Sequence, residues 1–166
     1  TTYDSTMVLS GVTWTFRISR PVDMFTPGNA DTASRPAIFW TPGEGEVGTD
    51  TNSLTKYGPH YYMNMGWDGS VQLGNGTHYP IIISIIPNAM NVRPNYTKQM
   101  LDTLRRRYHI KWNSIYVMGY SMGGFQWGRL LCNSSDGTET SCMGMIKAQV
   151  AVSGNAADNF NGVSFG

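Results

Sequence analysis

Charged residues are scarce in this sequence: they make up 14% of its 166 positions, and the net charge is +1. Nucleic-acid binding usually requires a basic face. The one basic cluster, Arg105-Arg106-Arg107, falls on an expected helix, where it forms a solvated face. No apolar run is long enough to cross a bilayer. We therefore expect neither a nucleic-acid nor a membrane partner, and the length suits a single domain over residues 1–166.

Cysteine is also sparse, with two in the chain, Cys132 and Cys142. They bracket a polar loop and predict a short disulfide in an oxidising compartment, with two free thiols as the alternative. The composition is poor in Lys and Glu, which predicts a secreted protein. Three sequons, at Asn75, Asn95 and Asn133, are possible glycosylation sites.

Metal and nucleotide motifs are missing as well. Neither cysteine has a histidine at metal-ligand spacing, and no glycine-rich nucleotide fingerprint is present. We expect no cofactor.

Strands and helices alternate along most of the chain. Residues 12–19 alternate apolar and polar side chains, as a half-buried strand does, and residues 81–86 form a β-branched run typical of a strand covered on both faces. Further strands are predicted at 37–40, 115–118 and 146–152, and helices within 50–62, 97–108 and 121–132. This order predicts an α/β fold with a mostly parallel sheet and helices on both faces.

The chemistry centres on Ser121, which lies in Gly119-Tyr120-Ser121-Met122-Gly123. A buried strand leads into this motif and a helix leads out of it, which is the setting of a strained nucleophile turn. Gly119 and Gly123 keep side chains away from neighbouring backbone, and Gly124 gives the helix start further clearance. The pattern predicts a serine nucleophile, against the alternative of an incidental serine in a glycine-rich turn.

A serine nucleophile needs donors for the oxyanion that forms in the reaction. One is expected from the backbone N–H of Met122, the residue after the serine. The second is expected from the loop after strand 37–40, where Gly43 allows the backbone to turn and the N–H of Glu44 is the candidate. The alternative is an ordinary glycine-rich turn.

Two stretches carry a family resemblance. Residues 42–48 (PGEGEVG) match an oxyanion loop of the form HGxGExG, with proline in place of histidine. Residues 107–124 (RYHIKWNSIYVMGYSMGG) are similar to a block of the form KYxIDxxRIYxxGxSMGG. Over residues 37–155 the chain thus resembles secreted α/β-hydrolase esterases related to polyhydroxybutyrate depolymerases and to feruloyl and acetylxylan esterases, including members described as predicted peptidases.

The resemblance implies a carboxylic-ester hydrolase that forms an acyl-enzyme on Ser121, with the amides of Met122 and Glu44 as oxyanion donors. It leaves the substrate open, because this group acts on sugar-linked esters, polyesters and small acyl esters. Transacylation would use the same nucleophile turn.

The histidine of a catalytic triad is missing from its usual place after Ser121. The chain has three histidines, His60, His78 and His109, and all precede Ser121. His78 and His109 are expected at the opposite end of the strands, and a five-residue strand is already about 16 Å long. His60 lies on a connection between two strands, so its position does not exclude it as the catalytic histidine.

The catalytic acid has two candidate positions. Asp158 follows strand 146–152 at the expected edge of the sheet, and Asp68 is a weaker candidate. The histidine is expected from a second chain or from a C-terminal remainder, so that the chain represents about two-thirds of the usual fold. The rival hypothesis is a catalytically inactive hydrolase-fold protein used for binding or self-assembly.

Overall fold

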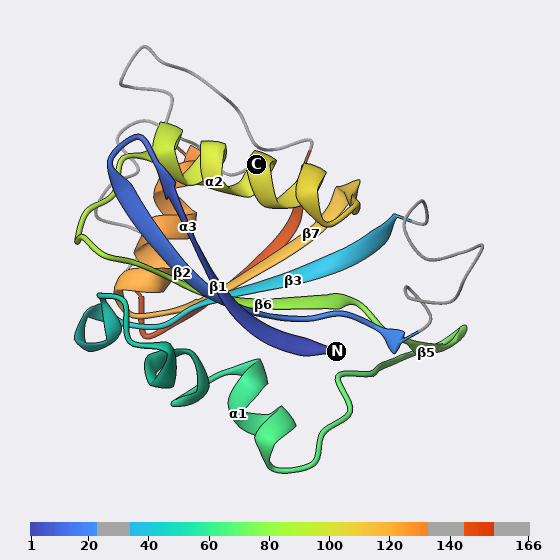
Figure 1. The fold of residues 1–166 in the computed structure, drawn as a ribbon. Helices are drawn as coiled ribbons and strands as arrows, with labels where there is room; N and C mark the ends of the chain where they lie inside the picture. Colours follow the sequence, from blue (N-terminus) through green and yellow to red (C-terminus); the bar gives the residue numbers. More distant parts are fainter. Residues whose placement is uncertain (23–33, 133–144, 155–166) are drawn as a thin grey trace.

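A computed structural model describes residues 1–22, 34–132 and 145–154. Its main feature is a six-stranded sheet in the order β1-β2-β6-β3-β7-β8 (Figure 1). The strands are β1 (Thr2–Leu9), β2 (Val12–Ser19), β3 (Arg35–Thr41), β6 (Ile81–Pro87), β7 (Ile110–Tyr120) and β8 (Ile146–Val152).

The sheet is antiparallel at one side and parallel at the other. β1 pairs with β2, and β2 with β6, in antiparallel fashion, whereas β6, β3, β7 and β8 run parallel to one another. Every residue of β6 is buried, which explains its unbroken apolar sequence. The mostly parallel sheet predicted from the sequence is confirmed, and the carboxyl ends of β3, β7 and β8 meet at one edge.

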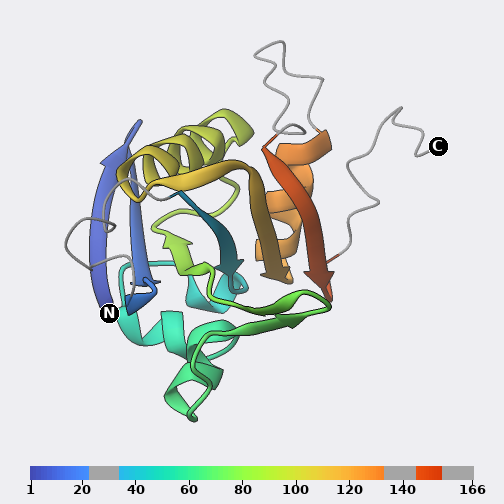
Figure 2. The same ribbon diagram turned by 90° about the vertical axis from the view of Figure 1, so that its right-hand side faces the viewer.

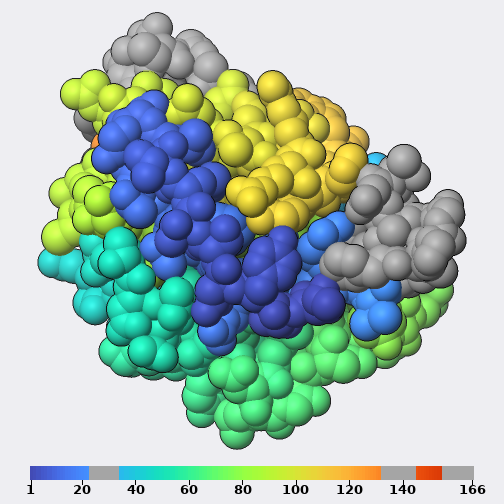
Figure 3. Space-filling model, viewed as in Figure 1, coloured from blue at the N-terminus to red at the C-terminus, as the bar shows by residue number. Residues whose placement is uncertain are grey.

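Helices lie on both faces of the sheet, as predicted. On one face, α3 (Met122–Cys132) packs over β7 and β8, and α2 (Pro94–Arg107) packs over β7, β1 and α3. The other face carries η3 (Thr51–Thr55) and α1 (Pro59–Asn64), which pack against β2 and β6 (Figures 1 and 2). Figure 3 shows β1 at the surface between α2 above and the α1 region below.

The core between α2, α3 and the sheet is built from large apolar side chains. Trp127 of α3 meets Phe39 of β3 edge to face, with ring centroids 6.0 Å apart. Burial of side chains of this size contributes about 1.5–3 kcal/mol each, so this contact fixes the helix that begins beside Ser121. Other fully buried members are Trp14, Phe16, Ile83, Met100, Leu104 and Val117.

Several segments differ from the sequence prediction. Residues 50–62 form two short helices rather than one, because Gly58, with a φ of 77°, interrupts them. Residues 63–79, where the sequence analysis places no strand, contain the hairpin of β4 (Val71–Leu73) and β5 (Gly76–His78). The helix predicted from residue 97 begins at Pro94, which suits a first helical turn because proline lacks an N–H. Among the described residues, no helix combines the length and apolar character needed to cross a bilayer.

Candidate active site

Ser121 lies at the turn between β7 and α3, at the edge where the parallel strands end. Its φ is +50°, a left-handed conformation that non-glycine residues rarely adopt. The Ser121 N–H donates to the Val152 carbonyl of β8 at 2.8 Å, and its carbonyl accepts from Phe125 N–H at 3.1 Å. The strained serine is therefore held by the adjacent strand and by the first turn of α3.

The glycines around Ser121 are required by close backbone packing. A Cβ on Gly119 would lie 2.3 Å from the carbonyl carbon of Gly123, and a Cβ on Gly123 would lie 2.0 Å from the carbonyl oxygen of Thr41. Gly124 is less constrained, since its Cβ would be 3.2 Å from the Gly119 oxygen. No side chain fits at Gly119 or Gly123 unless the turn moves.

Gly154 belongs to the same packing and was missed by the sequence analysis. A Cβ there would lie 3.1 Å from the carbonyl oxygen of Ser121. The signal in the sequence was a glycine two residues after strand 146–152, but a strand end alone does not reveal the partner on another element.

The loop after β3 lies beside this turn. The carbonyls of Thr41 and Pro42 are the groups nearest to Gly123, and Glu44 begins the short helix η2 (Glu44–Glu46). Met122 in turn begins α3. The first N–H groups of a helix have no acceptor within it, so Glu44 and Met122 can each offer a backbone donor at this edge of the sheet.

An ion pair ties this loop to the next segment. The buried carboxylate of Glu46 accepts a hydrogen bond from Lys56 Nζ at 2.8 Å. This hydrogen bond, with the charge of Glu46, raises the pKa of Lys56 above its ordinary value. The pair fixes η2 against the stretch between η3 and α1.

The side chain of His60 forms its hydrogen bonds in a different part of the core. It is buried on α1, with Nδ1 2.6 Å from Ser84 Oγ and Nε2 3.1 Å from Ser19 Oγ. Burial, with the nearby charge of Arg17, lowers the pKa of His60 to about 4. Ser84 lies on β6, two strands from β7, which corresponds to about 10 Å across the sheet. The structure therefore does not bring His60 to Ser121.

The remaining two of the chain's three histidines are also placed away from the serine. His109 directly precedes β7, so the strand separates it from Ser121, and its carbonyl accepts from Arg35 N–H. His78 lies on the β4–β5 hairpin, with Nε2 2.8 Å from Asn75 Oδ1.

The candidate acids do not complete the site within the described residues. Asp158 lies outside them. Asp68 lies in the loop before β4, where hydrogen bonds from Ser70 lower the pKa of its carboxyl. It borders a hollow at the amino end of β6, together with Pro80 and Ile82, at the opposite end of the strand from the nucleophile turn.

The other predicted groups can be placed only in part. Cys132 ends α3, and Cys142 lies outside the described residues, so the disulfide stays a prediction. Within the described ranges, no group of three His, Cys, Asp or Glu residues is arranged to hold a metal ion.

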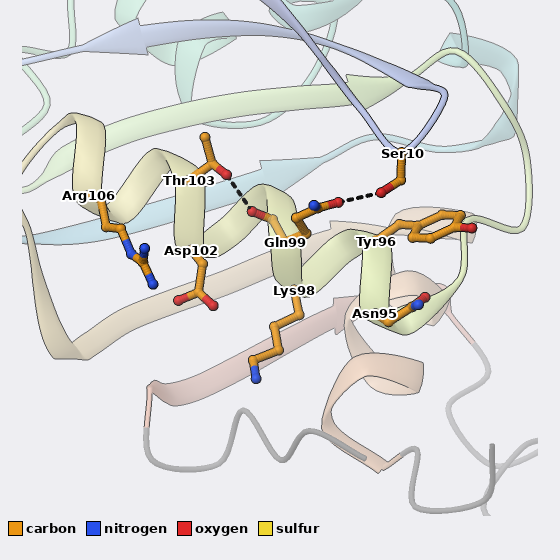
Figure 4. Close-up of a pocket in the computed structure, with 8 residues that line it drawn as sticks. All are labelled: Ser10, Asn95, Tyr96, Lys98, Gln99, Asp102, Thr103 and Arg106. Carbon is orange, nitrogen blue, oxygen red and sulfur yellow. Dashed lines mark hydrogen bonds between the residues drawn. The ribbon is translucent and has the colours of Figure 1, made fainter. Parts of the chain in front are cut away.

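A polar hollow of about 540 Å³ lies elsewhere, between the outer side of α2 and the β1–β2 turn (Figure 4). Ser10 Oγ donates to Gln99 Oε1 at 2.6 Å across it, and Thr103 donates to the Gln99 carbonyl at 2.7 Å. Its lining comes from α2 and Ser10, and includes neither the nucleophile turn nor the loop after β3. It is therefore separate from the candidate active site.

Comparison with known proteins finds no matching family model and no matching curated protein. Solved structures with similar folds do exist. They include a Rhizomucor miehei esterase (17% identity, TM-score 0.57, covering 97% of this chain and 46% of that one). A ferulic acid esterase matches at 14% identity and a TM-score of 0.60, over 93% of this chain and 57% of that one.

The metagenomic carboxylesterase EstE1 matches at 17% identity and a TM-score of 0.54, over 93% of this chain and 47% of that one. Identities this low establish the fold alone. The chain therefore has the α/β-hydrolase fold, as the sequence predicted, and it spans about half the length of these esterases.

Proposed function

We propose that this chain carries the nucleophile of a serine hydrolase that cleaves carboxylic esters. The observation that supports this most strongly is the left-handed Ser121, with a φ of +50°, between two glycines that have no room for a side chain. A turn of this kind lifts the serine hydroxyl above the sheet, where a substrate can reach it. The esterases of the same fold agree with this function.

In the proposed reaction, Ser121 Oγ attacks the carbonyl carbon of the ester while its proton passes to a histidine. The N–H groups of Met122 and Glu44 stabilise the resulting oxyanion. The alcohol then leaves with the proton, an acyl ester remains on Ser121, and water hydrolyses it. The substrate class includes polymer-linked esters.

The proton acceptor is proposed to come from a second chain or from sequence beyond these 166 residues, because His60, His78 and His109 all lie elsewhere. Asp158 is the proposed acid that orients it. It follows β8, whose last residue Val152 holds the backbone of Ser121.

The same placement of the histidines favours a second candidate function. A hydrolase fold without a histidine at Ser121 would serve in binding or self-assembly, with the nucleophile turn kept as a structural element. The two candidates differ in whether the Ser121 hydroxyl is activated.

Fluorophosphonate labelling tests this difference. With the second chain or further sequence that supplies the histidine present, we expect a single adduct by intact mass, located on Ser121 by peptide mapping, and no adduct with Ser121→Ala. Ser10→Ala is the matched control, because Ser10 is also left-handed, with a φ of 51°, but lies in the β1–β2 turn. Absence of an adduct on the wild-type protein under these conditions would favour the binding or assembly function. An adduct that persists in Ser121→Ala would show that another residue reacts.

Secretion is a separate proposal. Asn75 is exposed between β4 and β5, so its side chain is accessible to a glycosylating enzyme. Mass analysis of protein expressed through a glycosylating secretory route, before and after glycosidase treatment, tests it.

A further inference from the structure

Two tyrosines lie beside the loop that is proposed to bind the oxyanion. Tyr120 ends β7 and directly precedes Ser121. Its ring lies against Gly43, so that a Cβ at Gly43 would be 3.2 Å from Tyr120 Cδ1. Gly43 in turn precedes Glu44, the proposed donor. The ring of Tyr120 therefore lies beside the loop that carries the proposed oxyanion donor.

Tyr57 extends this aromatic surface. Its ring centroid is 6.1 Å from that of Tyr120, and the two ring planes are tilted by 46°. Both remain largely exposed, 45% for Tyr57 and 40% for Tyr120. Two large rings that touch each other and still face solvent offer an unfilled aromatic surface.

The position of Tyr57 is fixed by its neighbours rather than left to solvent. The ammonium of Lys56 lies 5.4 Å from the Tyr57 ring centroid, and the same ammonium bonds Glu46 in the loop. On the other side, Gly58 packs directly on the indole of Trp40. A surface held in this way needs little ordering when a ligand binds.

We propose that Tyr57 and Tyr120 form an aromatic shelf that binds an aromatic ring carried by the ester substrate. This inference rests on the proposed ester hydrolysis at Ser121. The ring belongs to either the acyl or the alcohol part of the ester, since both parts extend from the carbonyl. One favourable ring contact corresponds to about a 2- to 10-fold gain in affinity.

The test measures binding to the Ser121→Ala chain, which cannot form an acyl-enzyme. The probes are methyl benzoate, with the ring on the acyl side, and phenyl acetate, with the ring on the alcohol side. Methyl cyclohexanecarboxylate and cyclohexyl acetate are their saturated counterparts. Dissociation constants come from ligand-observed NMR. We expect at least one aromatic ester to bind about threefold or more tightly than its saturated counterpart.

Variants of the shelf connect this preference to the two tyrosines. Tyr57→Leu and Tyr120→Leu should remove the preference, whereas Tyr57→Phe and Tyr120→Phe should keep it. Tyr61→Leu is the matched control, because Tyr61 is 41% exposed and also pairs with a neighbouring ring, that of Tyr62. Near-ultraviolet circular dichroism verifies the fold of each variant. A second measurement does not depend on the shelf variants. NMR on the Ser121→Ala chain, with both tyrosines in place, should detect contacts between the ring protons of the ligand and the rings of Tyr57 or Tyr120.

The outcomes separate this inference from the proposed function. A preference for methyl benzoate places the ring on the acyl side, and one for phenyl acetate places it on the alcohol side. Equal binding of aromatic and saturated esters would overturn the inference, as would equal loss of the preference in Tyr61→Leu. Failure of fluorophosphonate labelling with an intact ring preference would instead overturn hydrolysis and leave the shelf as a binding site.

Discussion

Individual backbone positions explain how the nucleophile turn is maintained. A non-glycine residue in the left-handed region costs about 1–3 kcal/mol, and Ser121 is such a residue. Its hydrogen bonds to Val152 and Phe125 offset this cost. Gly119 and Gly123 contribute by allowing β7, α3 and the end of β3 to approach closely.

The packing at Gly123 leads to the first prediction. Gly123→Ala should reduce the free energy of unfolding by about 2 kcal/mol or more, because the new methyl group would lie 2.0 Å from the carbonyl oxygen of Thr41. Urea unfolding measures this change. The control is Gly45→Ala, where a Cβ meets nothing within 4 Å, and the change should stay within about 0.5 kcal/mol. Equal stability of the two variants would contradict the packing described.

His60 gives a prediction about pH. Burial lowers the pKa of His60 from the ordinary 6.5 to about 4. Between these values the unfolded chain binds a proton that the folded chain does not. The contribution of His60 is therefore fully present above pH 6.5 and is lost as the pH falls toward 4. The difference between the two pKa values corresponds to a change of roughly 3 kcal/mol in the free energy of unfolding.

Urea unfolding across pH 4 to 7 tests this expectation. His60→Gln should flatten the pH dependence, since Gln does not titrate and can still hydrogen-bond to Ser19 and Ser84. His78→Gln, at an exposed position on the hairpin, should leave the wild-type slope. A slope that survives in His60→Gln would assign the effect to other groups.

At the scale of elements, the segment between η3 and α1 depends on a contact with β3. Gly58 has a φ of 77°, and a Cβ there would lie 2.4 Å from Trp40 Cε2. Gly66 has a φ of 104°, but its surroundings are open. The two glycines share the left-handed conformation and differ in packing, which makes them a matched pair.

Alanine substitutions at these glycines should therefore differ in effect. Gly66→Ala should cost about 1–2 kcal/mol for the left-handed backbone alone. Gly58→Ala should cost about 1–3 kcal/mol more, because the indole of Trp40 or the start of α1 must shift. Urea unfolding of the two variants and of the wild type measures the difference in the free energy of unfolding. If both substitutions cost the same, the contact with Trp40 does not hold α1 in place.

Elements also show how far the sequence could predict the structure. The parallel half of the sheet was predictable, because β6 is buried on both faces and its sequence is therefore a continuous apolar run. β1 was not assigned, since most of its residues are exposed and its alternation is weak. The β4–β5 hairpin is not predicted by the sequence pattern, because its strands are three residues each and glycines surround them.

The site could be anticipated only where its residues are adjacent in sequence. The turn from Gly119 to Gly124 is a local pattern, so its strand–turn–helix setting was visible. Gly154 and Tyr57 contact the turn or its neighbours from segments distant in sequence. Such contacts depend on the order of strands in the sheet, which periodicity does not reveal.

At the scale of the whole molecule, the two faces of the sheet are covered unequally. α2 and α3 cover one face, whereas on the other face α1 and η3 pack on β2 and β6, and Gly58 between them reaches Trp40 of β3. Around β7 and β8 that second face leaves exposed Tyr116 (42%), Val150 (48%) and Val152 (43%). A hollow of about 580 Å³ lies between this face and the β4–β5 hairpin, which Figure 1 shows at the side where the parallel strands begin. Contiguous apolar surface of this kind marks an interaction site or an aggregation liability.

This surface should bind a hydrophobic fluorescent dye in the folded state. We expect enhanced anilinonaphthalene sulfonate fluorescence at pH 7, reduced by Val150→Lys because a charge in the middle of the apolar strip opposes dye binding. The control is Val8→Lys on β1, since Val8 is 67% exposed but lies on the opposite edge strand. If both variants lower the fluorescence equally, the dye reports general surface charge. A selective loss in Val150→Lys would show that β8 and its neighbours form the accessible apolar face.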